Sequence, residues 1–317
     1  MLVELQRYKN NPIFSPKKEN MWESKAVMNP GVCLEKNDFH MLYRALSSEA
    51  IILPKVKEYH LSYIGYAHSE DGVIFERREQ PFIKPEQDWE ELGCEDARAV
   101  KIDDTYYIFY TAVSKAKDGG INVRIAGAVT ADFERLEKYG FIDLQGRCKA
   151  ASLFPEKVDD RYAFLYTQYA DTPQSTIFYT EVESIEQLFD PIKWRKTNKV
   201  PLLTPSKGVY RGPELGASPV KTPKGWLLIY CPESFKREWF IGAALLDIKD
   251  PTKVVAKTTK PLLKPEMSYE LKGYTDNVAF PSGAVVVGDE LYVYYGSADD
   301  GCCLATCKLY KLLSSLT

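Results

Sequence analysis

A polar turn followed by a strand of alternating aromatic and aliphatic residues occurs five times along the chain. The five copies read KNDFHMLYRA, IDDTYYIFYTA, VDDRYAFLYTQ, TPKGWLLIYCP and VGDELYVYYGSA. Their turn residues, spaced 56 to 66 positions apart, are Asp38, Asp104, Asp160, Gly225 and Asp289. Alternation of this kind after Asn-Asp, Asp-Asp or Gly-Asp pairs is typical of strands that follow a hairpin turn.

A shorter apolar strand precedes each copy and a third strand follows it. The preceding strands read VMNPGVCLE, CEDARAVKI, KAASLFPEKV, LGASPVKT and TDNVAFPSGAVVV, and the following ones LSYIGYAHS, VRIAGAVTAD, STIFYTEVE, FIGAALLDI and CCLATCKLY. Helical periodicity is nearly absent outside the short segments SIEQLF and LYKLL. Five copies of a multi-strand unit predict an all-β chain, a single five-bladed β-propeller spanning residues 1–317 as one domain. The N-terminal LQRYKNNPIF is expected to add the outer strand of the last blade.

The composition of the chain restricts the classes of partner that it can bind. The chain has 317 residues, 45% of them hydrophobic, and a net charge of −3, which opposes a surface for nucleic acid or anionic membrane. The N-terminal MLVELQRYKNNPIF lacks the apolar core of a signal peptide, and no uncharged run is long enough to cross a bilayer. These features predict a cytoplasmic protein with neither a nucleic acid nor a membrane as partner. A homo-oligomer is left open.

The metal-ligating and nucleophilic residues form no recognisable motif. The seven cysteines are odd in number and have no CxxC spacing, and the three histidines, His40, His60 and His68, are scattered. No G-x-S-x-G sequence accompanies them. We therefore expect reduced thiols, no metal site and no cofactor.

Charged residues stand in apolar surroundings in the stretch GCEDARAV, where Glu95, Asp96 and Arg98 lie within four positions. In a propeller the first strand of each blade lines the central axis, so polar residues of five distant strands would meet at one end of it. The predicted axial residues are Asn29, Glu95, Asp96, Arg98, Lys149, Glu214, Asp276 and Asn277. A water-filled channel would explain such residues. Opposed carboxylates around a concave site also suit acid and base chemistry.

The sequence resembles glycoside hydrolase family 130, the five-bladed mannoside phosphorylases and mannosidases, over nearly its whole length. The motifs that carry the resemblance occur in order: MNPG at Met28–Gly31, LYRA at Leu42–Ala45, GYAHSEDG at Gly65–Gly72, GCEDARA at Gly93–Ala99, LFPEK at Leu153–Lys157, KTPKGWLLIY at Lys221–Tyr230, IGAALLDIKDP at Ile241–Pro251, NVAFPSGAV at Asn277–Val285 and YYGSADD at Tyr294–Asp300. Each motif alone is a weak signal, and nine in order are a strong one.

The resemblance implies roles for several of these residues. Asp96 would be the proton donor, acting through a sugar hydroxyl that relays the proton to the glycosidic oxygen. Such a carboxyl must keep its proton near neutrality, through burial or a neighbouring charge such as Glu95. Further matches to the family's active site are Arg44 and Arg98 (sugar hydroxyls or an oxyanion), Asp299 (the nonreducing-end sugar), Asn29 and Lys149. The alternative for each is an internal contact that only holds the blades together.

Departures from the phosphorylase pattern point to hydrolysis. Phosphorylases of the family carry His-Arg where this chain has Tyr166-Thr167, a cation where it has Glu214, and a His where it has Cys231 before Pro232. Those basic residues bind phosphate, which a carboxylate at position 214 would repel. An inverting hydrolase instead needs a carboxylate to deprotonate water. Glu214 is the predicted base, Glu233 is second, and the predicted substrates are β-1,2- or β-1,4-linked manno-oligosaccharides.

Two alternatives to this β-mannosidase stay open. The first is a β-mannoside phosphorylase that binds inorganic phosphate through other cations, such as Arg44, Arg98, Lys149 and Arg211, and releases α-mannose 1-phosphate. The second is a propeller that binds a glycan without cleaving it. The intact GCEDARA motif favours an enzyme. In each case the expected partner is an oligosaccharide, and phosphate is a partner in the phosphorylase alone.

Overall fold

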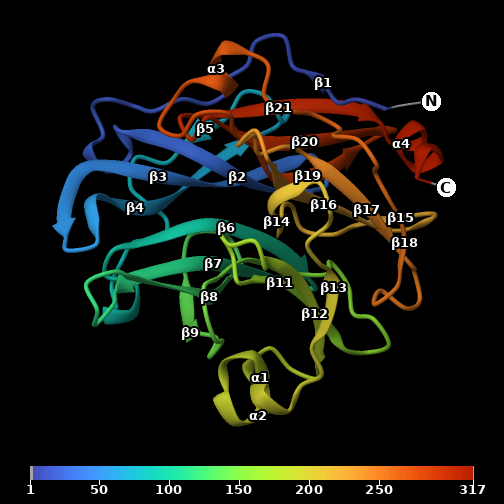
Figure 1. Ribbon diagram of the computed structural model, residues 1–317, viewed down its shortest axis with the longest axis horizontal. Helices are drawn as coiled ribbons and strands as arrows, with labels where there is room; N and C mark the ends of the chain where they lie inside the picture. The colour runs from blue at the N-terminus through green and yellow to red at the C-terminus, as the bar shows by residue number, and fades with distance from the viewer. Residues whose placement is uncertain (1–2, 317) are drawn as a thin grey trace.

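The computed structural model describes residues 3–316 and is almost entirely built of β-strands, as predicted (Figure 1). The helices are α1 (Glu186–Phe189), α2 (Pro191–Lys196), α3 (Ser268–Leu271) and α4 (Leu309–Ser315), with single 3-10 turns η1 (Met21–Glu23) and η2 (Asp88–Glu90). Helices α1 and α4 coincide with SIEQLF and LYKLL. No helix between residues 3 and 316 is both long and apolar enough to cross a membrane. In the same residues all seven cysteines are free thiols.

The described strands form four sheets. The largest runs in the order β2-β3-β4-β6-β7-β8-β9, with β5 beside β4, and contains β2 (Ala26–Glu35), β3 (Asp38–Leu53), β4 (Val56–Ser69), β5 (Glu76–Arg77), β6 (Gly93–Ile102), β7 (Thr105–Lys115), β8 (Ile121–Thr130) and β9 (Glu137–Phe141). The second contains β10 (Cys148–Leu153), β11 (Tyr162–Gln168), β12 (Thr176–Val182) and β13 (Val200–Leu203) in sequence order.

The third sheet contains β14 (Val209–Leu215), β15 (Val220–Thr222), β16 (Gly225–Ser234), β17 (Gly242–Leu246) and β18 (Val254–Lys257). The fourth runs in the order β1-β21-β20-β19 and contains β1 (Gln6–Arg7), β19 (Ala279–Val287), β20 (Glu290–Ser297) and β21 (Gly301–Lys308). The sheet count is therefore four, where the sequence pattern predicts five.

A single parallel pair, Ser62 with Gly93, joins the two halves of the largest sheet. All other strand pairs within the sheets are antiparallel. A Cβ atom added to Gly93 would lie 1.9 Å from the Ser62 hydroxyl oxygen, so the absence of a side chain lets the two strands approach this closely. The halves that meet here begin at β2 and β6, and each holds one copy of the aromatic repeat.

The aromatic repeats form β3, β7, β11, β16 and β20, each paired with a strand that precedes it in the chain. Rings of these strands fill the space between neighbouring sheets. The ring centroids of Phe109 in β7 and Phe164 in β11 lie 4.8 Å apart, and that of Trp226 in β16 lies 4.9 Å from that of Phe154, which follows β10. The aromatic content of the chain thus serves the core, where large rings bury most apolar area per residue.

The five preceding strands share a β-bulge, which no sequence pattern had indicated. Their register with the aromatic strand shifts between Met28 and Gly31, Glu95 and Arg98, Lys149 and Ala151, Arg211 and Glu214, and Pro281 and Gly283. A bulge bends its strand and re-aims side chains, and is common next to active sites. The axial residues predicted from the sequence fall at or beside these bulges on four of the five strands.

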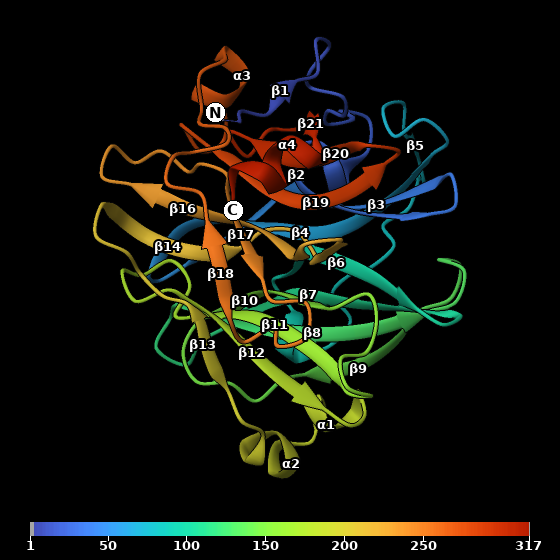
Figure 2. The same cartoon turned by 90° about the vertical axis from the view of Figure 1, so that its right-hand side faces the viewer.

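The N-terminal strand β1 pairs with β21, so that the first and last strands lie side by side (Figure 2). Arg7 of this strand donates from Nε and Nη2 to the carboxylate of Glu270 in α3, at 2.8 and 2.9 Å. Glu270 is fully buried and also accepts from the Tyr295 hydroxyl. The N-terminal segment is therefore tied to the last sheet by a buried charge as well as by backbone pairing.

We expect Arg7→Ala to lower the free energy of unfolding by about 1–3 kcal/mol, because Glu270 would stay buried without its cation. Urea denaturation measures the change. The matched control is Arg161→Ala, which breaks an exposed ion pair with Glu183 and should cost about 0–1 kcal/mol. Equal losses in the two variants would contradict this account of the closure.

Candidate active site

The bulges of β2 and β6 bring Asn29 and Asp96 together. Both residues have positive φ, 49° and 53°, a conformation that is rare outside glycine and concentrates at functional sites. The side-chain amide of Asn29 donates to Oδ1 of Asp96 at 2.8 Å. The two predicted site residues are therefore in direct contact, and Asp96 is only 6% exposed.

Glu95 and Arg44 form a salt bridge beside Asp96. Oε1 of Glu95 accepts from Arg44 at 2.7 Å, from the Tyr59 hydroxyl at 2.7 Å and from the Ser62 hydroxyl at 2.8 Å. Nη1 of Arg44 lies 3.8 Å from Oδ1 of Asp96. The charge of Glu95 is thus balanced by Arg44, whose guanidinium also faces the proposed acid.

Asp299 belongs to the same group of charges. Burial raises the pKa of Asp299, and the nearby Asp96 acts in the same direction, while Thr275 and Arg44 oppose the shift. Its φ is 52°, so it too lies in the left-handed region. Asp299 therefore lies near Arg44 and Asp96, and its role in holding the nonreducing-end sugar stays a prediction.

Arg98 lies next to the site without facing it. The side chain is buried and donates to three main-chain carbonyls, those of Asp96 (2.6 Å), Gly216 (2.8 Å) and Leu215 (3.1 Å). Desolvation by burial lowers the pKa of Arg98 to about 10. Three of its five N–H donors are thus used by main-chain carbonyls, which does not support the predicted role of holding sugar hydroxyls or an oxyanion. Arg98 thus links β6 to the end of β14, the strand that carries Glu214.

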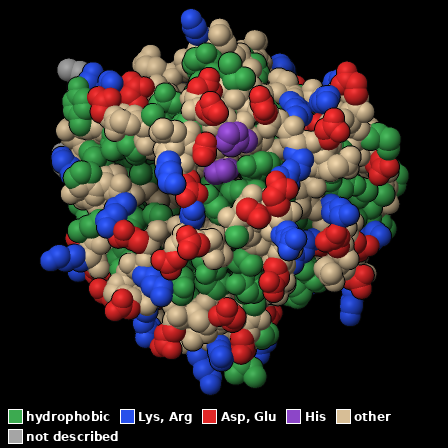
Figure 3. All heavy atoms as spheres, turned by 180° about the vertical axis from the view of Figure 1, so that it is seen from behind, with side chains coloured by type: hydrophobic (Ala, Val, Ile, Leu, Met, Phe, Trp, Pro, Cys, Tyr) green, Lys and Arg blue, Asp and Glu red, His purple; other side chains and the backbone are tan. Residues whose placement is uncertain are grey.

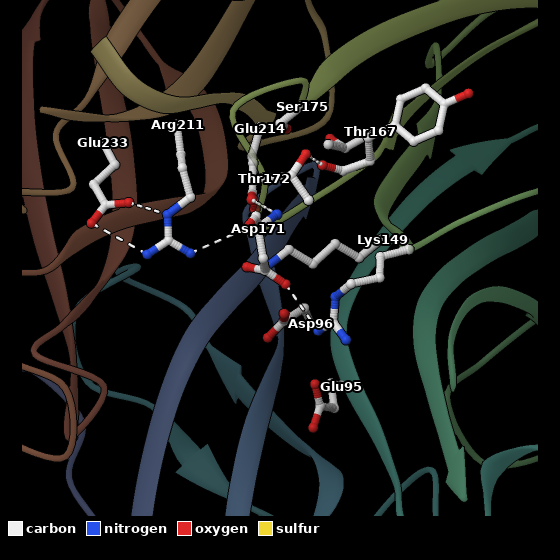
Figure 4. Close-up of polar contacts among 12 residues, drawn as sticks. Glu95, Asp96, Lys149, Thr167, Asp171, Thr172, Ser175, Arg211, Glu214 and Glu233 are labelled. Carbon is white, nitrogen blue, oxygen red and sulfur yellow. Dashed lines mark hydrogen bonds and ion pairs between the residues drawn. The ribbon is translucent and has the colours of Figure 1, made fainter. Parts of the chain in front are cut away.

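Glu214 is fully buried and forms a compact cluster with Lys149 and Asp171 (Figure 4). Its Oε1 accepts from the backbone N–H of Asp171 at 3.0 Å, and its Oε2 lies 3.1 Å from Nζ of Lys149. Nζ of Lys149 also donates to Oδ1 of Asp171 at 2.9 Å. Burial raises the pKa of Glu214 even though Lys149 opposes the shift. A carboxylate in this position is more basic than one in water.

Glu233, the second predicted base, is held by two guanidinium groups. Arg211 donates to it from Nε, and Nε of Arg237 lies 2.7 Å from its Oε1. Nη1 of Arg211 also donates to the main-chain oxygen of Asp171 at 3.2 Å. Both ion pairs hold Glu233 as the shared partner of two guanidinium groups. Glu214 stays the first candidate for the base.

Asp276 and Asn277 are not on an axial strand, since β19 begins at Ala279. Asp276 is exposed and forms an ion pair with Lys272 in solvent. Asn277 has a φ of 61°, and its main-chain oxygen accepts from the N–H of Trp239 at 3.0 Å. The prediction that these residues lie on the first strand of the last unit is wrong, because the sequence preceding Ala279 forms a loop after α3.

Sequence reasoning missed Asp171, together with Tyr59 and Ser62. Asp171 follows an aromatic strand in the run YADTPQS, which looks like an ordinary turn. Its importance comes from contacts with residues of other strands, and no local pattern encodes these. Among residues 3–316 no group of three or more His, Cys, Asp or Glu side chains is arranged to hold a metal ion.

Comparison with known proteins gives the family. A family model described as beta-1,4-mannooligosaccharide phosphorylase matches residues 4–317. The chain belongs to glycoside hydrolase family 130, as the sequence motifs had indicated. It is 36% identical over 303 residues to a beta-1,2-mannobiose phosphorylase of Thermoanaerobacter sp. strain X514, covering 94% of this chain and 95% of that one. It is 35% identical over 301 residues to a 1,2-beta-oligomannan phosphorylase of the same strain, with the same coverage.

Solved structures agree with this membership. The beta-1,2-mannobiose phosphorylase of Listeria innocua, in complex with beta-1,2-mannobiose, superposes with a TM-score of 0.83 at 27% identity, covering 99% of each chain. Another structure comes from work describing glycoside hydrolases of the family that target beta-1,2 mannosidic linkages in Candida mannan. It has a TM-score of 0.79 at 24% identity, over 98% of this chain and 95% of that one, and shows the shared fold alone.

Proposed function

We propose that this protein is an inverting enzyme that cleaves β-mannosides, with Asp96 as the acid, Glu214 as the base and water as the acceptor. One observation carries the choice of water. The cations nearest Glu214 are already matched by carboxylates, Lys149 by Asp171 and Glu214, and Arg211 by Glu233. A phosphate dianion requires cations that are not already neutralised. The mannoside substrate is supported by the relatives, which are named for β-1,2- and β-1,4-linked mannosides.

The proposed reaction is a single displacement. Glu214 would take a proton from water as the water oxygen bonds to the anomeric carbon, and the bond to the leaving oxygen would break. Asp96 would supply the proton that the leaving oxygen needs, through the sugar hydroxyl that family resemblance implies. The product sugar would have the α configuration, because one displacement inverts the anomeric carbon. Arg44, Asp299 and Asn29 surround Asp96 and would hold the sugar.

Phosphorolysis is the second candidate, and the curated relatives favour it over hydrolysis. The relatives with 34% to 36% identity are all named phosphorylases. Arg44, Lys149 and Arg211 keep 18% to 20% of their side-chain surface exposed, so an anion could reach them. The acceptor would then be inorganic phosphate and the product α-mannose 1-phosphate.

Incubation with β-1,2- and β-1,4-mannobiose, with and without inorganic phosphate, tests the choice of acceptor. In phosphate-free buffer we expect each disaccharide to yield two molecules of free mannose. The rate of cleavage should not change when phosphate is added. Mannose 1-phosphate formed only with phosphate would establish the second candidate. A folded protein that turns over neither disaccharide under either condition would favour a glycan-binding propeller without catalysis.

We also propose that the described strands form the five blades of one propeller. The support is the fivefold occurrence of a bulged strand paired with an aromatic strand, together with the pairing of β1 with β21. Limited proteolysis should then release no stable half of the chain.

Figure 3 shows acidic and basic side chains interspersed over one face of the molecule, and such a face has no basic patch that would bind a polyanion.

A further inference from the structure

Asp171 lies in the segment between β11 and β12 and uses each of its polar groups in the site. Its carboxylate accepts from Lys149 through Oδ1 at 2.9 Å and from Nη2 of Arg147 through Oδ2 at 3.0 Å. Its main-chain oxygen accepts from Arg211 at 3.2 Å, and its N–H donates to Glu214 at 3.0 Å. One residue thus engages three cations, Lys149 of β10, Arg211 of β14 and Arg147 just before β10.

The segment that carries Asp171 is fixed at both ends. The N–H of Ala170 donates to the main-chain oxygen of Arg147 at 3.1 Å, and the hydroxyl of Ser175 donates to that of Pro213 at 2.9 Å. Both Ala170 and Ser175 are fully buried. Between them Asp171 has a φ of 63°, which aspartate tolerates better than most residues. The backbone on both sides of Asp171 therefore fixes the position of its carboxylate in the site.

The contacts of this carboxylate are those of a bound anion. Each of its two oxygens accepts a hydrogen bond from a cation, Lys149 or Arg147. Proteins bind a phosphate or a carboxylate ligand in the same way. Three carboxylates, those of Asp171, Glu214 and Glu233, face four cations, Arg147, Lys149, Arg211 and the half-exposed Arg237. Replacing Asp171 with a neutral residue raises the excess from one positive charge to two, at a partly buried place where screening is weak.

We propose that Asp171 is a built-in anion that occupies the cation site and thereby excludes inorganic phosphate from the position beside Glu214. It is a specificity-determining residue and not a catalytic one, since it acts by neutralising Arg147 and Lys149. The consequence of this exclusion, that water and not phosphate is the acceptor, rests on the proposed function. Removing the carboxylate should open an anion site formed by Arg147, Lys149 and Arg211.

The test measures binding of inorganic phosphate to the resting full-length protein by titration calorimetry, with ionic strength held constant by chloride. Asp171→Asn should bind phosphate at least about tenfold more tightly than wild type, because one opposing charge is gone. Asparagine tolerates positive φ and keeps both main-chain contacts. The control is Asp118→Asn, which removes an exposed loop carboxylate paired with Lys55 and should leave phosphate binding unchanged.

A second change locates the site. Adding Arg147→Gln to Asp171→Asn should return phosphate affinity towards the wild-type level. If Asp171→Asn does not fold, as judged by thermal unfolding, Asp171→Gly replaces it, since glycine also accepts this backbone conformation. Equal phosphate affinity in wild type and the Asp171 variant, an equal gain in Asp118→Asn, or no effect of Arg147→Gln would each overturn the proposal.

Failure of this inference and failure of the proposed function can be told apart. Calorimetry on the resting protein does not depend on turnover or on the identity of the acceptor. Phosphate-dependent turnover by the wild type would overturn hydrolysis, whereas unchanged phosphate binding in Asp171→Asn would overturn the role of Asp171 and leave hydrolysis standing.

Discussion

Asp96→Asn is expected to lower the turnover of a β-mannobiose by about 10²–10⁴-fold and to leave the fold intact. The amide has the size of the carboxyl and can still accept the hydrogen bond from Asn29, which is 2.8 Å long. It cannot supply the proton that a sugar leaving group needs. Initial rates on mannobiose, with thermal unfolding as the check on folding, measure the effect.

An aryl β-mannoside with an acidic phenol serves as the control substrate. Its leaving group departs without much protonation, so the loss of the acid should affect its cleavage far less. If Asp96→Asn cleaved mannobiose at close to the wild-type rate, Asp96 would not be the acid. If both substrates lost activity equally, Asp96 would act in binding and not in proton transfer.

The sequence could predict the strands because their signal is local. The aromatic alternation that follows Asp38 or Asp104 depends on neighbouring residues only, and it correctly located β3 and β7. The same alternation could not predict which way Arg98 points. A bulge between Glu95 and Arg98 adds a residue to the strand and breaks the two-residue period beyond it. Arg98 therefore turns to main-chain carbonyls instead of facing the site.

The proposed acid, Asp96, could be predicted because it lies in a long family motif, whereas Asp171 could not be found in this way. Its partners Lys149, Glu214 and Arg211 lie on β10 and β14, and only the packed structure brings them to one segment. The positive φ of Asn29 and Asp96 was also hidden, because neither residue is glycine. Local chemistry thus predicted which strands line the site, and long-range packing decided which side chains meet there.

Glu214→Gln is expected to abolish hydrolysis, with a loss of about 10²–10⁴-fold if Glu214 is the general base. Burial raises the pKa of Glu214, so the carboxylate that takes the proton is lost as the pH falls through this raised value. The wild-type rate should therefore decline on the acid side at a pH above about 4.3, the ordinary pKa of glutamate. That decline should be absent from the residual activity of Glu214→Gln.

Azide distinguishes loss of a base from loss of structure. A small anion can attack the anomeric carbon without a base, so azide should partly restore cleavage by Glu214→Gln and form α-mannosyl azide. The matched control is Glu233→Gln, since Glu233 is equally buried but is paired with Arg211 and Arg237. Azide should not restore activity in that variant. Rescue of Glu233→Gln and not of Glu214→Gln would exchange the roles of the two carboxylates.

The same substitution also separates the two acceptors. If the enzyme is a phosphorylase, Glu214→Gln removes a negative charge 3.1 Å from Lys149, and both phosphate affinity and phosphorolysis should rise. If Glu214 only supports Lys149 and the backbone of Asp171, turnover should persist while stability falls. Rates measured against phosphate concentration for wild type and Glu214→Gln distinguish the three cases. If the wild-type rate depends on phosphate concentration, the acceptor is phosphate and not water, whatever the variant does. The reason is that phosphate does not take part in hydrolysis.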